Sequence, residues 1–437
     1  MTKRIHAPNV TNIVMRLIVF IYDVLFLILF LFYLPFLFLS KKWHDGFFLR
    51  LGWPPELLQQ ELQGKRNIWI HAVSVGEILA VLGLLKRLKE RFPEHRLVLT
   101  TVTLTGYQLA KTNCPSDILV IFAPLDLSWV VKKFIRMINP VIYISAETEI
   151  WPNLFRALSH AHVPLVIVNG RISDKAFERY AWIRPFLKSI LSAVHVFCMQ
   201  SDTDASRIIA LGADFSKVKV VGNIKFDEVS EIHPIRPGDL GLSASDMLWI
   251  AGSTHPGEED IVLNTFKALK LQWRNIHLVL APRHIDRVAD VQSMVKEHGL
   301  QPINFSQLDG SAVSSHHVIV VDTIGHLRAL YSAATIVFVG KSLTGWGGQN
   351  IIEPAIYGKP ILVGPHMENF RNVLKIFEEN QAIVKINNRR ELLHSMERLL
   401  KNSKERESLG QRARQVVQKY QGATQKTQDV IEHILKI

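Results

Sequence analysis

Cysteine is scarce in this chain, and the loops that usually bind metals and nucleotides are missing. The 437 residues include two cysteines, Cys114 and Cys198, which form no CxxC pair or other metal-binding spacing. This scarcity excludes a disulfide framework and favours a reducing compartment, with both thiols in structural positions. The sequence also lacks a Walker motif, a well-formed GxGxxG, a short repeat and a low-complexity tract. A nucleotide ligand would therefore be held without either of these loops.

Acidic residues are fewer than basic ones, and this imbalance narrows the choice of partner. The chain has 39 Asp and Glu against 51 Lys and Arg, which gives a formal net charge of +12. Such a charge favours an anionic partner, and nucleic acid, anionic lipid or a phosphorylated substrate fits it equally well. The hydrophobic fraction of 48% argues against disorder. At this length we expect two domains of ordinary size and an extension.

The amino end carries a long apolar run that separates these partners. From Leu17 to Leu39 the only charged side chain is Asp23. As a helix this run is about 34 Å long, enough to cross the hydrocarbon of a bilayer. Basic residues flank it on both sides, so the positive-inside rule gives no orientation, and a helix lying in the cytoplasmic leaflet fits equally well. We expect residues 1–40 to be a membrane anchor that is separate from the folded domains.

The rest of the chain alternates between short β-branched runs and amphipathic segments. NIWIHAV, RLVLTTVT, VIYISAE and PLVIVNG read as strands, and helix-like segments separate them. The pattern lapses at FDEVSEIHPIRPGDLGLSASD, the best linker in the chain, and a second series then begins with MLWIAGS. This rhythm predicts two doubly wound, Rossmann-like domains with a cleft between them. Their expected bounds are 41–230 and 231–420, and a final helix at 421–437 would pack back on the first domain.

Several strand ends in the second half carry polar or flexible residues. They are Gly252–Thr254, Pro282–His284, Thr323–Gly325, Gly340–Ser342 and Gly364–His366. One such tripeptide is an ordinary turn, but five on consecutive strands indicate a ligand site, because parallel strands end at one edge of their sheet.

Arg283 and Glu353 give this expected site its chemistry. Backbone amides, hydroxyls and Arg283 suit a phosphate, whereas the Glu353 carboxylate suits ribose hydroxyls, which need an acceptor. The alternative is that Asn350 is a helix N-cap and Glu353 the acid three residues later. The neighbouring strand ends favour a nucleotide site.

The corresponding strand ends of the first half carry carboxylates instead. Glu77 follows IHAVSVG, and Glu147 and Glu149 follow VIYISA. A glutamate at such a turn suits a general base, and the helix dipole is expected to keep Glu77 ionised at neutral pH. The alternative for Glu77 is a simple helix-capping acid. Asp202 and Asp204 form a DxD pair at a helix start, where capping is favoured, so no metal site is predicted.

Taken together, the motifs resemble the 3-deoxy-D-manno-octulosonic acid (Kdo) transferases of lipopolysaccharide biosynthesis. The resemblance rests on IHAVSVGE, TTVTLTG, AETEIWPN, VNGRIS, GNIKFD, AGSTHPGEE, APRH and GGQNIIEPAIYGKPILVGPH, in unchanged order from the hydrophobic amino end to about residue 370. It implies a GT-B glycosyltransferase without a cofactor or metal, which inverts the transferred centre. CMP-Kdo would be the donor and lipid IVA or Kdo-lipid IVA the acceptor. The catalytic domains would lie on the cytoplasmic side of the bacterial inner membrane, with an anionic membrane surface and no nucleic acid as partner.

The resemblance also implies roles for single residues. Glu77 corresponds to the proton acceptor of the family, and Glu147 and Lys225 correspond to its transition-state stabilisers. The implied donor contacts are Pro282, Arg283, Ile324, Gly325, His326, Asn350, Ile351, Ile352 and Glu353. The chain departs from the pattern at His326, where many relatives have glutamate, and at Leu104, where proline is common.

Two rival functions stay open at this point. One is another envelope glycosyltransferase of the same fold that uses a UDP-sugar. The other is a membrane-tethered binding protein with a degenerate transferase fold, against which the intact Glu77 argues. The number of Kdo residues added is also open, because relatives attach one, two or more.

Overall fold

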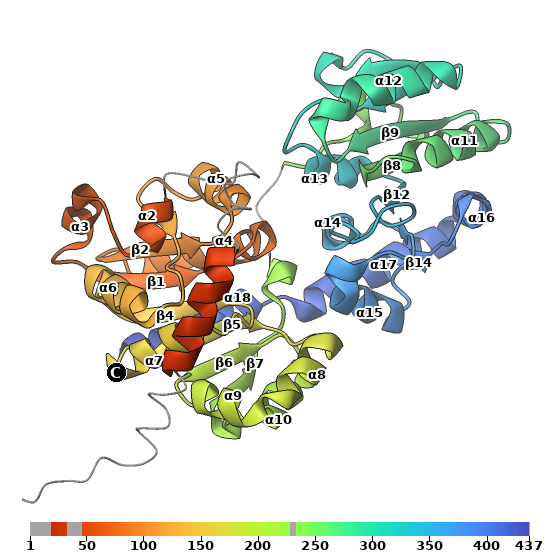
Figure 1. Ribbon diagram of the computed structural model, residues 1–437. Helices are drawn as coiled ribbons and strands as arrows, with labels where there is room; N and C mark the ends of the chain where they lie inside the picture. The colour runs from red at the N-terminus through yellow and green to blue at the C-terminus, as the bar shows by residue number, and fades with distance from the viewer. Residues whose placement is uncertain (1–18, 33–45, 228–232, 437) are drawn as a thin grey trace, which may run out of the picture. The chain divides into compact units, whose positions relative to one another are not determined.

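The computed structural model describes residues 19–32, 46–227 and 233–436 (Figure 1). The chain divides into two compact units, one formed by residues 1–228 with 421–437 and the other by residues 229–420. Each unit has its own sheet and its own core.

The first unit is built on a parallel sheet in the order β3-β2-β1-β4-β5-β6-β7. Its strands are β1 (Arg66–His71), β2 (His95–Thr101), β3 (Leu119–Phe122), β4 (Pro140–Ala146), β5 (Leu165–Gly170), β6 (Val196–Met199) and β7 (Val218–Val220). Its helices are α2 (Phe47–Arg50), α3 (Glu56–Leu62), α4 (Val75–Arg91), α5 (Leu104–Asn113), α6 (Ser128–Ile138), α7 (Pro152–His160), α8 (Asp174–Trp182), α9 (Arg184–Leu191), α10 (Asp202–Ala210), η1 (Phe215–Lys217), η2 (Ile224–Asp227) and α18 (Ala423–Leu435). The predicted parallel α/β architecture is confirmed for this unit.

Both faces of this sheet are buried, which is why its strands are apolar along their whole length. Along β1, Ile68 and Ile70 belong to one core cluster, and Trp69 between them belongs to the cluster on the other face. Trp69 packs edge-on against Tyr143 of β4, with ring centroids 4.9 Å apart. The indole of Trp69 is satisfied by a hydrogen bond to the Thr100 hydroxyl at 2.9 Å.

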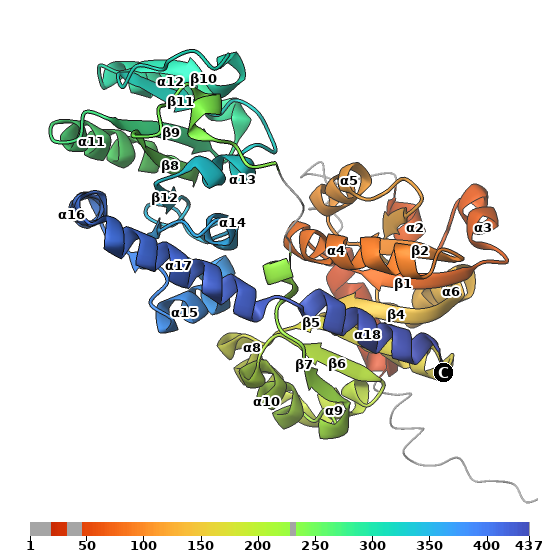
Figure 2. The same ribbon diagram turned by 180° about the vertical axis from the view of Figure 1, so that it is seen from behind.

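The last helix, α18, belongs to the first unit (Figure 2). Both carboxylate oxygens of Asp227 accept backbone N–H groups at its amino end, from Gly422 at 2.6 Å and Thr424 at 2.5 Å. Val430 and Ile431 then join the core cluster around α4. Asp227 thus ties the end of the first half of the chain to the start of its final helix.

The second unit repeats the design with the parallel order β10-β11-β9-β8-β12-β13-β14. Its strands are β8 (Met247–Thr254), β9 (Ile276–Pro282), β10 (Gln301–Asn304), β11 (His317–Val320), β12 (Ile336–Val339), β13 (Ile361–Val363) and β14 (Val384–Lys385). Its helices are η3 (Pro237–Leu240), α11 (Glu258–Lys270), η4 (Ile285–Arg287), α12 (Val288–Glu297), η5 (Phe305–Gln307), α13 (Leu327–Leu330), η6 (Tyr331–Ala333), α14 (Ile352–Ile356), η7 (Glu368–Phe370), α15 (Arg371–Glu379), α16 (Arg389–Lys401) and α17 (Ser403–Tyr420). In both sheets the strand order turns beside the first strand, β1 or β8, so the strand ends expected to carry ligands share one edge in each unit.

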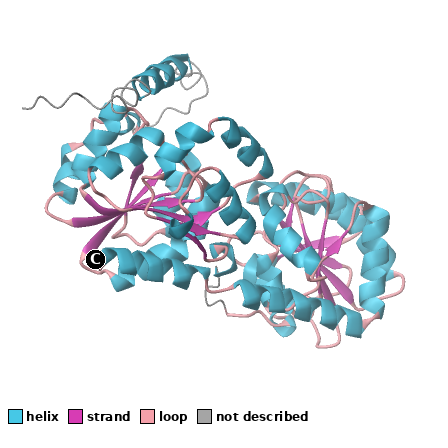
Figure 3. Cartoon of the chain, turned by 90° about the horizontal axis from the view of Figure 1, so that it is seen from below, coloured by secondary structure: helices cyan, strands magenta, loops and turns pink. Residues whose placement is uncertain are grey.

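A helix of residues 19–32, called the amino-terminal helix below, lies on the outside of the first unit (Figure 3). The expectation that this segment is separate from the folded domains is wrong for its described part. The Asp23 carboxylate is only 8% exposed, and its Oδ1 accepts hydrogen bonds from Ser128 N at 3.0 Å and Asn153 Nδ2 at 2.7 Å. Tyr22 donates its hydroxyl to Asp126 at 3.0 Å. Asp23 therefore docks the helix, because burying a carboxylate requires such partners.

The opposite face of the amino-terminal helix is apolar and exposed. Its more exposed side chains include Leu29 at 69% and Phe32 at 80%. Phe26 and Phe30, on the docked face, pack against the core of the first unit. Within the described ranges, no helix has both the length and the apolarity needed to cross a bilayer. The parts of the expected anchor at 1–18 and 33–40 lie outside the described residues.

Replacing Asp23 tests how the amino-terminal helix is held. We expect Asp23→Ala to weaken its docking by about 1 to 3 kcal/mol, because Ser128 N and Asn153 Nδ2 lose a shared acceptor. Hydrogen exchange of residues 19–32 measures the effect, and the exposed substitution Leu29→Ala is the matched control. Equal protection in Asp23→Ala and the intact protein would contradict the docking role.

Candidate active site

Glu77 lies at the start of α4, directly after the central strand β1. Its helix position follows from Ser74, an N-cap whose hydroxyl oxygen accepts a hydrogen bond from Glu77 N at 3.4 Å. The carboxylate turns back over the same turn. Glu77 Oε2 accepts from Val73 N at 2.8 Å, and Oε1 accepts from the Ser74 hydroxyl at 2.9 Å. The capping geometry expected as the alternative is therefore present, and it fixes the carboxylate at the carboxyl edge of the sheet.

The expectation that the helix dipole keeps Glu77 fully ionised at neutral pH is wrong. Only 7% of Glu77 is exposed, and burial raises its pKa to about 7 against the opposing effect of its two hydrogen bonds. The negative charges of Glu147 and Glu149 raise the pKa further. The free-energy cost of burying the charged carboxylate is larger here than the stabilisation that the helix dipole gives to that charge. A carboxylate poised near neutrality is well suited to exchanging a proton.

Glu147 and Glu149 stand in the loop that follows β4, the strand beside β1. Glu147 adopts a left-handed backbone with φ 53°, its N–H bonds Val168 O at 2.8 Å, and its Oε2 lies 3.5 Å from Arg171 Nε. In addition, Arg171 N donates a hydrogen bond to the Thr148 hydroxyl oxygen at 3.0 Å. These contacts fix the loop to the end of β5. Burial, followed by the charge of Glu147, raises the pKa of Glu149.

Lys225 lies in η2, after β7, at the far end of the same sheet. Its backbone is positioned by an amide network, in which Asn169 Oδ1 accepts from Ile224 N at 3.1 Å and Asn223 Oδ1 accepts from Lys225 N at 3.0 Å. Gln200 joins the two asparagines, donating to Asn169 O at 2.9 Å and accepting from Asn223 Nδ2 at 3.0 Å. The three residues that resemble the catalytic set of the family thus lie at strand ends of one sheet.

His71 and Trp151 are two polar side chains at this edge that sequence reasoning missed. Their rings meet edge to face, with centroids 5.9 Å apart. His71 Nδ1 is 2.9 Å from the Thr100 hydroxyl, while His71 Nε2 and Trp151 Nε1 have no hydrogen-bond partner among the described residues. Burial and then the charge of Arg50 lower the pKa of His71 to about 4, so the imidazole is neutral. Their positions in the sequence were the available signal, because His71 is the last residue of β1 and Trp151 follows closely after the Glu147–Glu149 segment.

The second unit brings its predicted residues to the carboxyl edge of β9, β11 and β12. Pro282 ends β9 and is buried, whereas Arg283 is exposed and its backbone N–H donates a hydrogen bond to Thr254 O at 3.0 Å. In the loop after β11, Ile324 is 85% exposed and Gly325 has φ 91°. His326 follows, and its ring rests against Phe305 with centroids 5.3 Å apart.

Glu353 lies in the first turn of the short helix α14, which begins at the buried Ile352 after the buried Ile351. Asn350 supports this turn from both sides, because its Oδ1 accepts from Ile352 N at 3.0 Å and its Nδ2 donates to Glu353 Oε1 at 3.2 Å. Glu353 Oε2 accepts no hydrogen bond from a described residue. Burial raises the pKa of Glu353, and the positive charges of Arg328 and Arg283 oppose this. Asn350 therefore supports the start of the helix, and Glu353 Oε2 can still accept a hydrogen bond from a ligand.

Glu258 organises the loop after β12 and was not predicted to have a role. It is 0% exposed, and its two oxygens accept four backbone N–H groups. Oε2 accepts from His255 at 2.9 Å and Lys341 at 2.8 Å, and Oε1 accepts from Ser342 and Leu343 at 2.9 Å each. Next to it, a Cβ on Gly340 would lie 2.8 Å from Glu258 Oε2 and 2.6 Å from Ser253 O, so only glycine fits.

Comparisons with known proteins agree with the pattern of these motifs. A family described as 3-deoxy-D-manno-octulosonic-acid transferase matches residues 45–228, and glycosyl transferases group 1 matches residues 261–416. The chain is 33% identical over 375 residues to a 3-deoxy-D-manno-octulosonic acid transferase of Haemophilus influenzae, covering 85% of this chain and 88% of the relative. This chain belongs to the Kdo transferase family. A transferase of the same name from Chlamydophila psittaci is 30% identical, covering 81% of this chain and 82% of that protein.

Solved structures support the fold of this Kdo transferase. The UDP-GlcNAc 2-epimerase of Neisseria meningitidis matches with a TM-score of 0.57 at 10% identity, covering 85% of this chain and 100% of that one. A putative UDP-N-acetylglucosamine 2-epimerase of Listeria monocytogenes matches with a TM-score of 0.53 at 15% identity, covering 86% and 96% of the two chains. These neighbours and the two parallel-sheet units are consistent with a GT-B glycosyltransferase fold.

The DxD pair of the transferase serves local structure. Asp204 is buried, and its Oδ1 accepts from Ile172 N at 2.8 Å while Oδ2 accepts from the Ser201 hydroxyl at 2.5 Å. The N-cap of α10 is Ser201 and neither aspartate, and Asp204 takes part in the cap through its contacts with the Ser201 hydroxyl. No group of three or more His, Cys, Asp or Glu within the described residues is arranged to hold a metal ion.

Proposed function

We propose that this Kdo transferase transfers Kdo from CMP-Kdo to lipid IVA, and that Kdo-lipid IVA is a further acceptor. The observation that carries the proposal is the Glu77 carboxylate, fixed at the carboxyl edge of the first sheet with a pKa near neutrality. The relatives are named as Kdo transferases, and the charge of +12 suits an anionic donor and a phosphorylated lipid acceptor.

In this mechanism Glu77 is the general base. An acceptor hydroxyl attacks the anomeric carbon of Kdo, a new C–O bond forms, and the bond from that carbon to the phosphate oxygen of CMP breaks. The hydroxyl proton passes to the Glu77 carboxylate, and CMP leaves with the bonding electrons. Attack on the face opposite to the leaving group inverts the anomeric centre. The hydrogen bonds from Val73 N and the Ser74 hydroxyl hold the carboxylate in one orientation for this transfer.

Glu147 and Lys225 are proposed to stabilise the transition state. The ion pair of Glu147 with Arg171 fixes its carboxylate, which suits the positive charge that develops on the sugar ring. Lys225 offers a cation for the departing phosphate, a function that many glycosyltransferases assign to a metal ion. This division of roles supports a metal-independent and cofactor-independent reaction.

The donor is proposed to bind the second unit through two kinds of contact. Arg283 and the backbone at Pro282, Ile324, Gly325 and His326 suit the phosphate and the base of CMP. Asn350 through Glu353 suit the ribose, because Glu353 Oε2 is an acceptor without a described partner. His326 replaces a glutamate common in relatives, and its ring already packs on Phe305, so we assign its donor contact to the backbone.

A UDP-sugar donor is the alternative, and it has some support from the fold, since structural neighbours are named as UDP-GlcNAc 2-epimerases. That likeness is at 10% and 15% identity and concerns the fold alone, whereas the relatives named as Kdo transferases reach 33%. Thermal protection by CMP but not by UDP separates the two donors. Protection by UDP alone would favour the alternative.

The transferase is proposed to work at the cytoplasmic face of the bacterial inner membrane, held by its amino-terminal helix. The exposed face of that helix is apolar while Asp23 docks its other face on the first unit, which suits a helix lying in a membrane surface. Flotation of the full chain with lipid vesicles tests this attachment. A protein that stays at the bottom of the gradient would contradict it.

Glu77→Gln tests the proposed base. We expect transfer to fall at least about 100-fold, since glutamine keeps the shape of the side chain and cannot take the proton. In the intact enzyme kcat/KM should rise with pH and level off above the Glu77 pKa of about 7, because only the ionised form is a base. This limb should be absent from Glu77→Gln, whose CMP affinity should match the intact enzyme. A variant that keeps more than a tenth of the normal rate would place the base elsewhere.

Glu353→Ala tests the proposed ribose contact. We expect CMP binding to weaken by about 1 to 3 kcal/mol, because the ribose hydroxyls lose a charged acceptor. Calorimetry with CMP measures the loss, and Glu353→Gln is the matched control because it keeps a carbonyl acceptor for Asn350. Unchanged CMP affinity in Glu353→Ala would return Glu353 to a capping role.

A further inference from the structure

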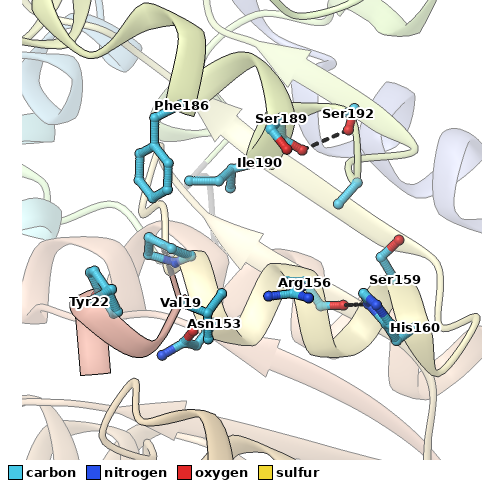
Figure 4. Close-up of a pocket in the computed structure, with 12 residues that line it drawn as sticks. Val19, Tyr22, Asn153, Arg156, Ser159, His160, Phe186, Ser189, Ile190 and Ser192 are labelled. Carbon is cyan, nitrogen blue, oxygen red and sulfur yellow. Dashed lines mark hydrogen bonds between the residues drawn. The ribbon is translucent and has the colours of Figure 1, made fainter. Parts of the chain in front are cut away.

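Two adjoining cavities open beside the start of the amino-terminal helix, on the first unit. One of about 190 Å³ lies between Val19 and Tyr22 of this helix and side chains of α7 and α9 (Figure 4). The second, of about 570 Å³, reaches from Val19 to α6. Both are lined by Asn153, Arg156 and His160. None of the residues assigned to the reaction lines either cavity.

Basic side chains dominate the charge of these cavities. Arg156 and His160 line both, and Lys132 and Arg136, one helical turn apart on α6, line the larger one. None of the four forms a side-chain ion pair with a described residue, and the polar contact of the His160 ring is to Arg156 O at 2.8 Å. The smaller cavity adds neutral donors, the hydroxyls of Ser159 and Ser189, whereas the Ser192 hydroxyl in its wall donates to Ser189 O at 2.7 Å. A guanidinium with hydroxyls beside it is a setting that suits a phosphate.

The nearby carboxylates, Asp23 and Asp126, are buried and do not form the cavity surface. Asp23 and Asp126 line neither cavity and are 8% and 1% exposed. Oδ1 of Asp23 accepts from Ser128 N and Asn153 Nδ2, and both oxygens of Asp126 accept, from Tyr22, Asn153 N and Leu154 N.

The neighbouring surface is apolar, which sets this basic site apart from a site for a free anion. The amino-terminal helix borders both cavities at Val19 and then exposes Phe20, Leu25 and Leu29, each more than half exposed. Phe186 and Ile190 add apolar walls to the smaller cavity. A phosphate held at Arg156 would therefore have room for hydrocarbon chains along the helix. Basic residues next to an apolar interfacial helix are typical of surfaces that recognise anionic lipids.

We propose that these cavities bind the phosphate head group of an anionic membrane phospholipid, with Arg156 as the main contact and Lys132, Arg136 and His160 around it. The site rests on the proposed membrane attachment and adds to it a lipid preference. It holds a lipid of the surrounding membrane and takes no part in the transfer reaction.

Flotation of the full chain with two kinds of vesicle tests the site. One kind is phosphatidylcholine alone, and the other is phosphatidylcholine mixed with phosphatidylglycerol. We expect the intact protein to prefer the mixed vesicles, and Arg156→Gln to lower its partition into them about fivefold to tenfold. The matched control is Arg179→Gln, an exposed arginine of α8 that does not line the cavities, with an expected change below about twofold. On phosphatidylcholine alone the three proteins should be equal.

Other results would overturn the proposal in distinct ways. Equal losses in Arg156→Gln and Arg179→Gln would show diffuse attraction to the membrane and no site. Thermal protection of the intact protein by inorganic phosphate, lost in Arg156→Gln while vesicle binding stays intact, would show a site for a free anion. Binding of the intact protein to neither vesicle would overturn the site and the membrane attachment together. Thermal protection by CMP, measured on all three proteins, should be unchanged, so a failure of the lipid site is separable from a failure of the proposed transfer.

Discussion

A glutamate at the first strand-to-helix turn is the constraint on which both units depend. Glu77 follows β1 and Glu258 follows β8, and in each sheet this strand lies where the order turns. Glu258 accepts four backbone N–H groups and fixes the loop after β12, so its lone pairs serve structure. Glu77 accepts from one N–H and one hydroxyl, which orients the carboxylate and leaves acceptor capacity for a proton. A glutamate at the same position of the fold therefore stabilises a loop in the second unit, whereas in the first unit it can still accept a proton.

The amino-terminal helix is fixed to the edge of the sheet that carries the proposed base. Asp126 lies in the loop after β3, and Asn153 lies in the first turn of α7, after the Glu147 loop, so both anchoring side chains come from segments that follow strands of this sheet. Asn153 holds Asp23 and Asp126 holds Tyr22, so these two residues fix the amino-terminal helix on the unit that carries Glu77. The proposed lipid site lies beside the same contact, at Arg156 on the same helix as Asn153. The proposed membrane attachment and the proposed base therefore belong to the same unit.

The sequence was sufficient for the two parallel sheets and for the family, because buried parallel strands are apolar along their length and the motifs keep their order. It was also sufficient to place the candidate residues at strand ends. The sequence did not predict the docking role of Asp23, which stood out only as the one charge in an apolar run. Its two hydrogen-bond partners lie more than a hundred residues away in the sequence. The pKa of Glu77 was missed for a similar reason, because local helix position argues for ionisation while burial and two distant carboxylates decide the outcome. The sequence did not indicate the loop-fixing role of Glu258, because it stands in a run of acidic residues that is typical of the first turn of a helix.

The central claim is that this chain joins Kdo to a lipid A precursor, and the most direct test is mass spectrometry of the lipid after incubation with the purified full chain and CMP-Kdo. Lipid IVA should gain the mass of one or more Kdo residues, with release of an equal amount of CMP, in the presence of a chelator. Lipid IVA of unchanged mass, from a preparation that binds CMP and is folded, would contradict the assignment.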